Sequence, residues 1–146
     1  MNTPDTLADD LIRAMPEALI FSDLRGFIVR WNHGAEEVFG FSTAEALGQS
    51  LDLIIPERMR QAHWEGYHKA LARGDVLPGR TSMITRSLHK SGESIYVDMS
   101  FAVVKDPQGR VIGSLAVARD ASKRFAEEKN LRRQLTELSA GKPAAA

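Results

Sequence analysis

Hydrophobic positions follow two different periods along this chain, and the periods predict its strands and helices. Apolar runs bounded by Gly, Pro, Asp and Asn are typical of strands. They occupy residues 18–22, 27–31, a segment that follows Pro78 and Gly79 and ends at Leu88, 94–104 and 111–118. The first two runs are joined through Gly26, which predicts a β-hairpin, and short polar turns join the last three into an antiparallel meander.

Apolar residues spaced three and four apart predict helices in the remaining segments. Asn32 is expected to cap a short helix that ends at Phe39, and Ser42 caps a shorter one, with Glu45 completing a capping box. The other helices are predicted over residues 5–15, over 56–72 with Gly74 as the stop, and over 121–138.

The order of these elements predicts an α+β domain. An antiparallel five-stranded sheet with the short helices gathered on one face accommodates it, with a flanking helix at each end. We therefore divide the chain into an N-terminal flanking helix in residues 1–15, a domain in 16–120, a charged C-terminal helix in 121–138 and a disordered tail in 139–146.

Composition narrows the classes of function. The 146 residues carry 19 Lys and Arg against 19 Asp and Glu, so no net charge attracts nucleic acid or anionic lipid. The chain has no cysteine, which excludes disulfides, thiolate metal sites and thiol nucleophiles. No signal-peptide pattern and no long apolar run occurs, so we expect a cytoplasmic protein with no nucleic-acid or membrane partner.

Short sequence motifs within these elements resemble those of the PAS family of sensory domains, over roughly residues 10–125. They are Ile20-Phe21-Ser22-Asp23, Val29-Arg30-Trp31-Asn32, Ala35-Glu36-Glu37-Val38-Phe39-Gly40-Phe41-Ser42 with Glu45 and Gly48, Ile54-Ile55-Pro56-Glu57, His89-Lys90-Ser91-Gly92-Glu93, Gly113 and Arg119-Asp120-Ala121-Ser122. The resemblance implies the PAS fold and a sensory, signal-transducing module that holds a small ligand or cofactor in its core.

The resemblance also implies how such a module transmits its signal. We expect ligand state to alter a homodimer or a contact with a separate signalling protein, because any output has to go through association. Leu131, Leu135 and Leu138 at one end, and Leu7 and Leu11 at the other, would leave apolar stripes in water. The predicted dimer therefore uses the terminal helices together with the sheet. The alternative is a dimerisation or adaptor domain that binds no cofactor.

Enzymatic activity is not expected. The chain contains no glycine-rich phosphate-binding motif, no zinc-hydrolase motif and no nucleophile-elbow motif. The flavin branch that forms a cysteinyl adduct is excluded because the chain has no cysteine.

His63 is the main candidate site residue. On the predicted 56–72 helix it shares a stripe with Met59, Gly66 and Tyr67, which is the face expected to meet the sheet. Haem-binding PAS oxygen sensors are similar here and carry their proximal histidine at this position, seven residues after the proline that corresponds to Pro56. The resemblance implies haem b with His63 as the iron ligand, and Gly66 would let a flat macrocycle approach the helix.

Two features keep a second interpretation open. Met83 stands where those oxygen sensors place an arginine over the distal face, and a thioether cannot donate a hydrogen bond to bound oxygen. Met83 is then either a second axial ligand or an apolar lining residue. His63 itself is either a haem ligand or a hydrogen-bonded core residue. The predicted cofactor site therefore comprises His63, Met83, Tyr67, Gly66 and Met59, with no catalytic residue.

Overall fold

The structure is a computed structural model that describes residues 4–76 and 82–141. Its helices are α1 (Pro4–Ala14), α2 (His33–Phe39), α3 (Thr43–Ala46), α4 (Arg60–Arg73) and α5 (Ser122–Gly141), with 3-10 turns η1 (Leu51–Ile54) and η2 (Glu57–Met59) before α4. Its strands are β1 (Ala18–Ser22), β2 (Ile28–Trp31), β3 (Met83–Leu88), β4 (Ser94–Lys105) and β5 (Val111–Asp120).

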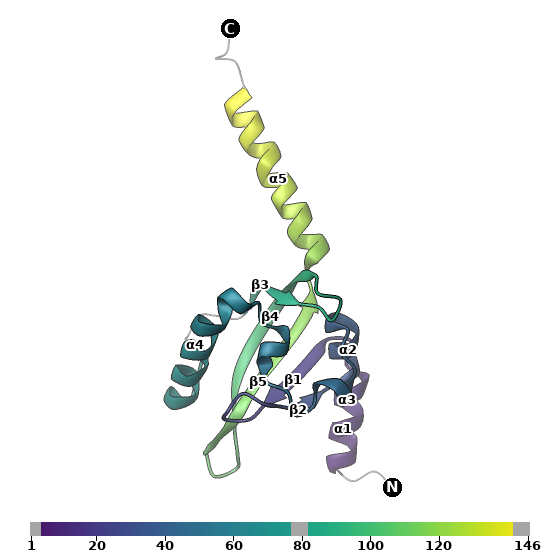
Figure 1. The fold of residues 1–146 in the computed structure, drawn as a ribbon, viewed down its shortest axis with the longest axis vertical. Helices are drawn as coiled ribbons and strands as arrows, with labels where there is room; N and C mark the ends of the chain where they lie inside the picture. Colours follow the sequence, from purple (N-terminus) through teal and green to yellow (C-terminus); the bar gives the residue numbers. More distant parts are fainter. Residues whose placement is uncertain (1–3, 77–81, 142–146) are drawn as a thin grey trace.

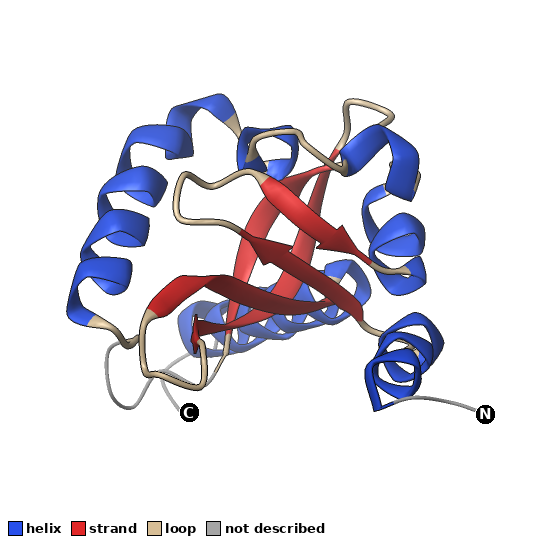
Figure 2. Ribbon diagram, turned by 90° about the horizontal axis from the view of Figure 1, so that it is seen from below, coloured by secondary structure: helices blue, strands red, loops and turns tan. Residues whose placement is uncertain are grey.

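The five strands form one antiparallel sheet in the order β2-β1-β5-β4-β3, which confirms the predicted α+β class. Cross-strand partners share a face of the sheet. Ile20 pairs with Ala116, and Met99 pairs with Ala118, and all four are buried, so they define an inner face. Figure 2 shows helices along both flanks of the twisted sheet.

The helix ends follow the predicted capping chemistry. The Asn32 side chain accepts a hydrogen bond from Ala35 N at 2.9 Å, and Ser42 and Glu45 form the reciprocal capping box. Gly40 and Gly74 end α2 and α4 in the left-handed conformation, at φ +83° and +86°. These local signals place the short helices against β1 and β2.

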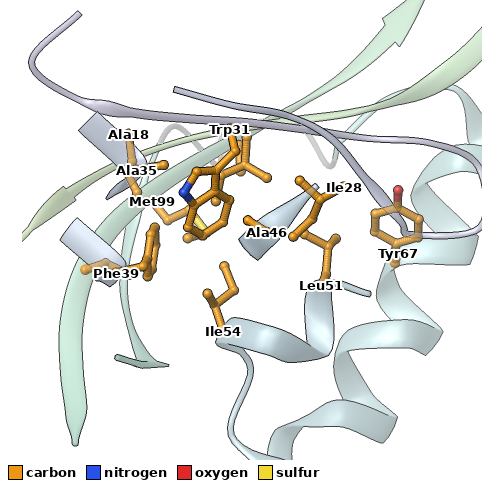
Figure 3. Close-up of a cluster of buried hydrophobic side chains, with 14 residues drawn as sticks. Ala18, Ile28, Trp31, Ala35, Phe39, Ala46, Leu51, Ile54, Tyr67 and Met99 are labelled. Carbon is orange, nitrogen blue, oxygen red and sulfur yellow. The ribbon is translucent and has the colours of Figure 1, made fainter. Parts of the chain in front are cut away.

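A tightly packed cluster fills the inner face beneath α2 and α3. Phe39 and Ala35 are 0% exposed, and the ring centroids of Phe39 and Trp31 are 5.5 Å apart. Asn32 also accepts from Leu19 N at 2.8 Å, and its amide donates to the carbonyls of two residues that flank the end of α1. Figure 3 shows Trp31 and Phe39 together and Tyr67 of α4 at the opposite end of the cluster.

Most element bounds differ from those expected by one or two residues, and three differences are larger or change the type of structure. The helix predicted from residue 56 begins as η2 and becomes α-helical at Arg60, because Pro56 has an extended ψ of 139°. Strand β3 begins at Met83, and residues 77–81, where the strand was expected to start, lie outside the described residues. Helix α5 continues to Gly141, beyond the expected end at 138; residues 142–146 of the predicted tail are not described.

Helices α4 and α5 stand apart from the packed cluster in different ways. In Figure 1, α4 lies to the left of the strands, whereas α1, α2 and α3 lie to the right. Helix α5 projects away from the domain. Tyr67 is the buried residue of α4, whereas α5 contains no buried residue. Helix α4 therefore packs against the domain through few residues, and α5 lies largely in solvent.

Candidate functional site

A cavity of about 110 Å³ lies on the inner face of the sheet next to α4. Most of its wall is apolar, and polar groups enter from α4 and from the neighbouring strands. The apolar wall includes Ile20, Ile54, Met59, Met99, Phe101 and Ala116, and the polar part includes Ser22, His63, Tyr67, Thr85, Ser87 and Ser114. An apolar pocket with a few convergent polar groups is the usual form of a ligand site.

His63 lies in the first half of α4 and lines this cavity. Its Nδ1 atom is buried and has no hydrogen-bond partner among the described residues. Burial lowers the pKa of His63 below its ordinary value of 6.5, and nearby Asp52 opposes that shift only in part. The side chain is therefore a neutral imidazole with one polar atom that lacks a partner, which is the form that binds a metal or accepts a ligand hydrogen bond.

Aromatic neighbours hold the His63 ring in place. Its centroid is 4.6 Å from that of Trp64 and 5.7 Å from that of Tyr67. Trp64 is fixed in turn, because its indole N–H donates to Asp52 Oδ1 at 2.8 Å. The Trp64 ring also fills the space beside the β1–β2 turn, where a Cβ on Gly26 would lie 2.2 Å from the Trp64 ring. These contacts anchor α4 to the domain beside the cavity.

Tyr67 closes the cavity on the side of β1. Its hydroxyl donates to the backbone carbonyl of Asp23 at 2.6 Å and lies 2.9 Å from Ser22 Oγ. Ser22 is 1% exposed, and its Oγ lies 3.3 Å from Ser114 Oγ on β5. Within the polar part of the wall, Tyr67, Ser22 and Ser114 thus form a connected chain of hydroxyl groups.

The structure brings together three of the five predicted site residues. His63, Met59 and Tyr67 line the cavity. Met83 pairs with Met99 and so belongs to the inner face, but it is the first residue of the edge strand β3, is 40% exposed and lies outside the lining. Gly66 is exposed on α4, and a Cβ built there meets no described atom within 4 Å.

Arg86 occupies the opposite face of β3, as its odd spacing from Met83 predicts. It pairs with Tyr96, and its Nη2 atom donates to the Tyr96 hydroxyl at 2.7 Å. The Tyr96 ring stacks on Phe125 of α5, with centroids 3.7 Å apart and an interplanar angle of 11°. Strand β3 therefore borders the cavity on one face and holds the start of α5 through the other.

The hydroxyl residues Ser22, Ser114, Thr85 and Ser87 were not predicted to belong to the site. Ser22 and Ser114 are 92 residues apart and meet because β1 pairs with β5. Thr85 and Ser87 also line the cavity, from the inner face of β3. Their only signal in the sequence is polar residues at inward positions of otherwise apolar strands, which is unusual for a core.

A larger groove of about 540 Å³ lies between α1, β2 and α2. Its ionisable groups already have partners: Arg30 pairs with Asp9, Arg13 with Asp10, and His33 Nδ1 lies 3.4 Å from Glu36 Oε1. The backbone N–H of Thr43, which donates to Glu36 at 2.7 Å, lowers the pKa of that carboxyl. With its charges already paired, this groove offers less to a ligand than the cavity beside His63.

The five-stranded antiparallel sheet with its flanking helices defines a class of α+β domains, and the comparisons give the family. A family model described as PAS fold matches residues 7–121, most of the chain, so the protein belongs to the PAS family. The structure of a PAS domain from Colwellia psychrerythraea superposes with a TM-score of 0.71 at 22% identity, covering 83% of this chain and 99% of that one. PAS domains are generally sensory modules, which supports a sensory role here.

Two curated relatives are sensor proteins. The chain is 33% identical over 63 residues to Sensor protein FixL of Bradyrhizobium diazoefficiens, covering 43% of this chain and 12% of that protein. It is 29% identical over 108 residues to Oxygen sensor protein DosP of Escherichia coli, covering 72% of this chain and 13% of that protein. The chain therefore spans only a small part of the length of these relatives. In the described part of the chain, no helix has the length and hydrophobicity needed to cross a membrane.

Proposed function

We propose that this protein is a non-enzymatic sensory module that binds a small ligand or cofactor beside His63 and couples its binding to an association between chains. The observation that carries the proposal is the buried Nδ1 atom of His63, which has no partner among the described residues and belongs to a cavity wall. Buried polar atoms are nearly always hydrogen-bonded, so an orphan in a cavity favours a ligand as its partner.

Haem b is the cofactor that we propose to test first. A neutral imidazole suits haem iron, and His63 meets that requirement at the position that haem-binding PAS sensors use. When bound, the iron would supply a site for a diatomic gas. The volume fits less well, because a cavity of about 110 Å³ would have to widen before it held a macrocycle. Met59 and Tyr67 would lie against the group.

The visible spectrum tests this cofactor directly. Protein purified with haem supplied should show a Soret band, and His63→Ala should abolish or shift it. His68→Ala is the matched control, because His68 is exposed on the same helix and stacks on Trp64 instead of lining the cavity. A spectrum without a Soret band, or with one that His63→Ala leaves unchanged, would rule haem out.

The contact between Tyr96 and Phe125 supports coupling to α5. Thr85 and Ser87 border the cavity, and Arg86 between them holds Tyr96 against α5. A ligand that displaces β3 would therefore move the base of that helix. Phe125→Ala should leave ligand binding intact and remove its effect on association, as measured by sedimentation of the chain with and without haem. Ligand-dependent association that persists in Phe125→Ala would contradict this route.

A second copy of the chain is the partner that the exposed leucines favour. Leu131, Leu135 and Leu138 of α5 are 57%, 64% and 62% exposed, and an isolated helix of this length is marginal in water. Leu7 and Leu11 of α1 are also exposed. We propose a homodimer through the terminal helices and the sheet, with a separate signalling protein as the other partner class. Leu135→Glu should weaken the dimer, and Thr136→Glu, with the same change in charge on another face of α5, should not.

A ligand-free adaptor is the second candidate, favoured by the small volume of the cavity. The hydroxyl groups of Tyr67, Ser22 and Ser114 in the cavity wall already bond to one another. The domain would therefore need little rearrangement to remain without a ligand. The adaptor interpretation predicts a dimer whose dissociation constant is the same in wild type and His63→Ala and does not respond to haem.

A further inference from the structure

The hydroxyl chain in the cavity wall has a fixed direction. The Asp23 carbonyl can only accept, so the single Tyr67 hydroxyl proton is committed to it at 2.6 Å. In the 2.9 Å contact between Ser22 Oγ and Tyr67 Oη, Ser22 is then the donor. By the same argument, Ser114 donates to Ser22 across 3.3 Å. The series of hydroxyl groups therefore ends at Ser114 Oγ. The proton of that hydroxyl is donated to Ser22, and its lone pairs are free to accept a hydrogen bond.

The cavity offers no charge to balance a charged ligand. Arg86 is the charged residue among its described lining, and its guanidinium bonds to Tyr96 on the opposite face of the sheet. Burial lowers the pKa of His63, which keeps that imidazole neutral. An ion placed in this apolar space would lose its hydration without gaining a partner, so the site favours a neutral molecule.

The volume limits the size of the occupant. A cavity of about 150 Å³ in another protein holds benzene, so one of about 110 Å³ holds roughly four or five non-hydrogen atoms. Ile20, Met99 and Phe101 form part of the apolar wall that would contact the rest of such a molecule. His63 lines the same cavity and adds a neutral polar side chain to its wall.

We propose that the cavity binds a neutral molecule of about four or five non-hydrogen atoms that donates an O–H or N–H to Ser114 Oγ. Small alcohols and primary amides are the ligand class. This inference rests on the proposed function in one respect, that the cavity beside His63 is the ligand site. It goes further by stating the polarity, charge and size that the wall selects.

Nuclear magnetic resonance of the full chain with three probes of matched size tests the ligand class. 2-Propanol is a donor, acetone only accepts, and acetate is charged. 2-Propanol should shift the amide signals of Ser22, Tyr67 and Ser114 in a saturable way. Acetone should bind about tenfold more weakly, because it leaves Ser114 Oγ without a donor, and acetate should cause no saturable shift.

Ser114→Ala should remove the preference for 2-propanol over acetone. Ser100→Ala is the matched control, since Ser100 pairs with Val117 on the outer face, and it should keep the preference. Equal affinities for 2-propanol and acetone in the wild type, a preference that survives Ser114→Ala, or no saturable shift with any probe overturns the inference. A Soret band that depends on His63 would then still support the proposed function. A preference for 2-propanol with no change in the dimer population supports the inference and contradicts the proposed coupling.

Discussion

The inner face of the sheet is packed differently at its two ends. Beneath α2 and α3, Phe39 is 0% exposed, and the Trp31 indole N–H donates to the Phe41 carbonyl at 3.0 Å. Beneath α4, Phe101 remains 40% exposed and the His63 Nδ1 atom has no partner among the described residues. The end beneath α2 and α3 is therefore the more tightly packed one, and the end beneath α4 keeps polar and aromatic groups that lack a full set of contacts.

The largest test of this comparison removes one phenyl ring at each end. Phe39→Ala should lower the free energy of unfolding by about 3–5 kcal/mol, because the ring is fully enclosed and its loss leaves a cavity. Phe101→Ala should cost less than about 2 kcal/mol, since much of that ring already contacts water. Urea denaturation measures both. Equal losses would show that the two ends are packed alike.

Adding one methyl group should have opposite effects at the two ends. A Cβ on Gly34 would lie 2.2 Å from the Glu17 carbonyl oxygen, so Gly34→Ala should destabilise the fold by about 1–3 kcal/mol. A Cβ on Gly66 meets no described atom within 4 Å, so Gly66→Ala should stabilise α4 by up to about 1 kcal/mol. Thermal unfolding compares the pair. A loss of stability in Gly66→Ala would mean that α4 packs more closely than described.

The pH dependence of stability should change when His63 becomes Leu. Because burial lowers the pKa of His63, the unfolded chain binds more protons just below pH 6.5, and wild-type stability falls as the pH decreases through that window. His63→Leu should flatten this part of the slope and change stability little at higher pH. Denaturation at about pH 7.5 and about pH 5.5 measures the difference. Identical slopes in the two proteins would contradict a buried neutral imidazole.

The smallest effect is expected at an exposed ion pair beside the end covered by α2 and α3. Lys90 in the β3–β4 hairpin donates to Glu45 of α3 at 2.7 Å, and with the Ser42 backbone N–H it lowers the Glu45 pKa to about 2. Lys90→Met should raise that pKa towards 4.5, as followed by carboxyl resonances during titration. Wild-type stability from this contact is present above pH 4.5 and is lost as the pH falls towards 2. Lys129→Met on α5 is the control and should leave the Glu45 titration unchanged.

Local chemistry predicted the packed end better than the ligand end. The Ser42 and Glu45 capping box and the left-handed Gly40 depend on neighbours in the chain, so the sequence contains their whole cause. The hydroxyl chain depends on strands far apart in sequence, so the Ser22 and Ser114 contact has no local signal.

The α4 stripe shows why a regular periodicity was only partly correct. It placed His63 and Tyr67 on the side of the sheet, as the structure does, but it also placed Gly66 there, and that residue is exposed. Trp64, which the predicted stripe did not include, packs against the core. The helix is held by the backbone of the β1–β2 turn at Gly26 and by the Asp52 side chain of η1, both of which contact Trp64.

The length of α5 gives its first turn mechanical leverage. The helix has 20 residues and contacts the domain near Phe125 and through the ion pair of Arg124 with Asp98, so the remainder acts as a rigid lever arm. The 16 residues after Phe125 make an arm about 24 Å long at about 1.5 Å per residue, and a tilt of about 10° at its base would move its tip by roughly 4 Å. A small displacement of the Tyr96 ring would thus become a shift of several ångströms at the far end of the helix.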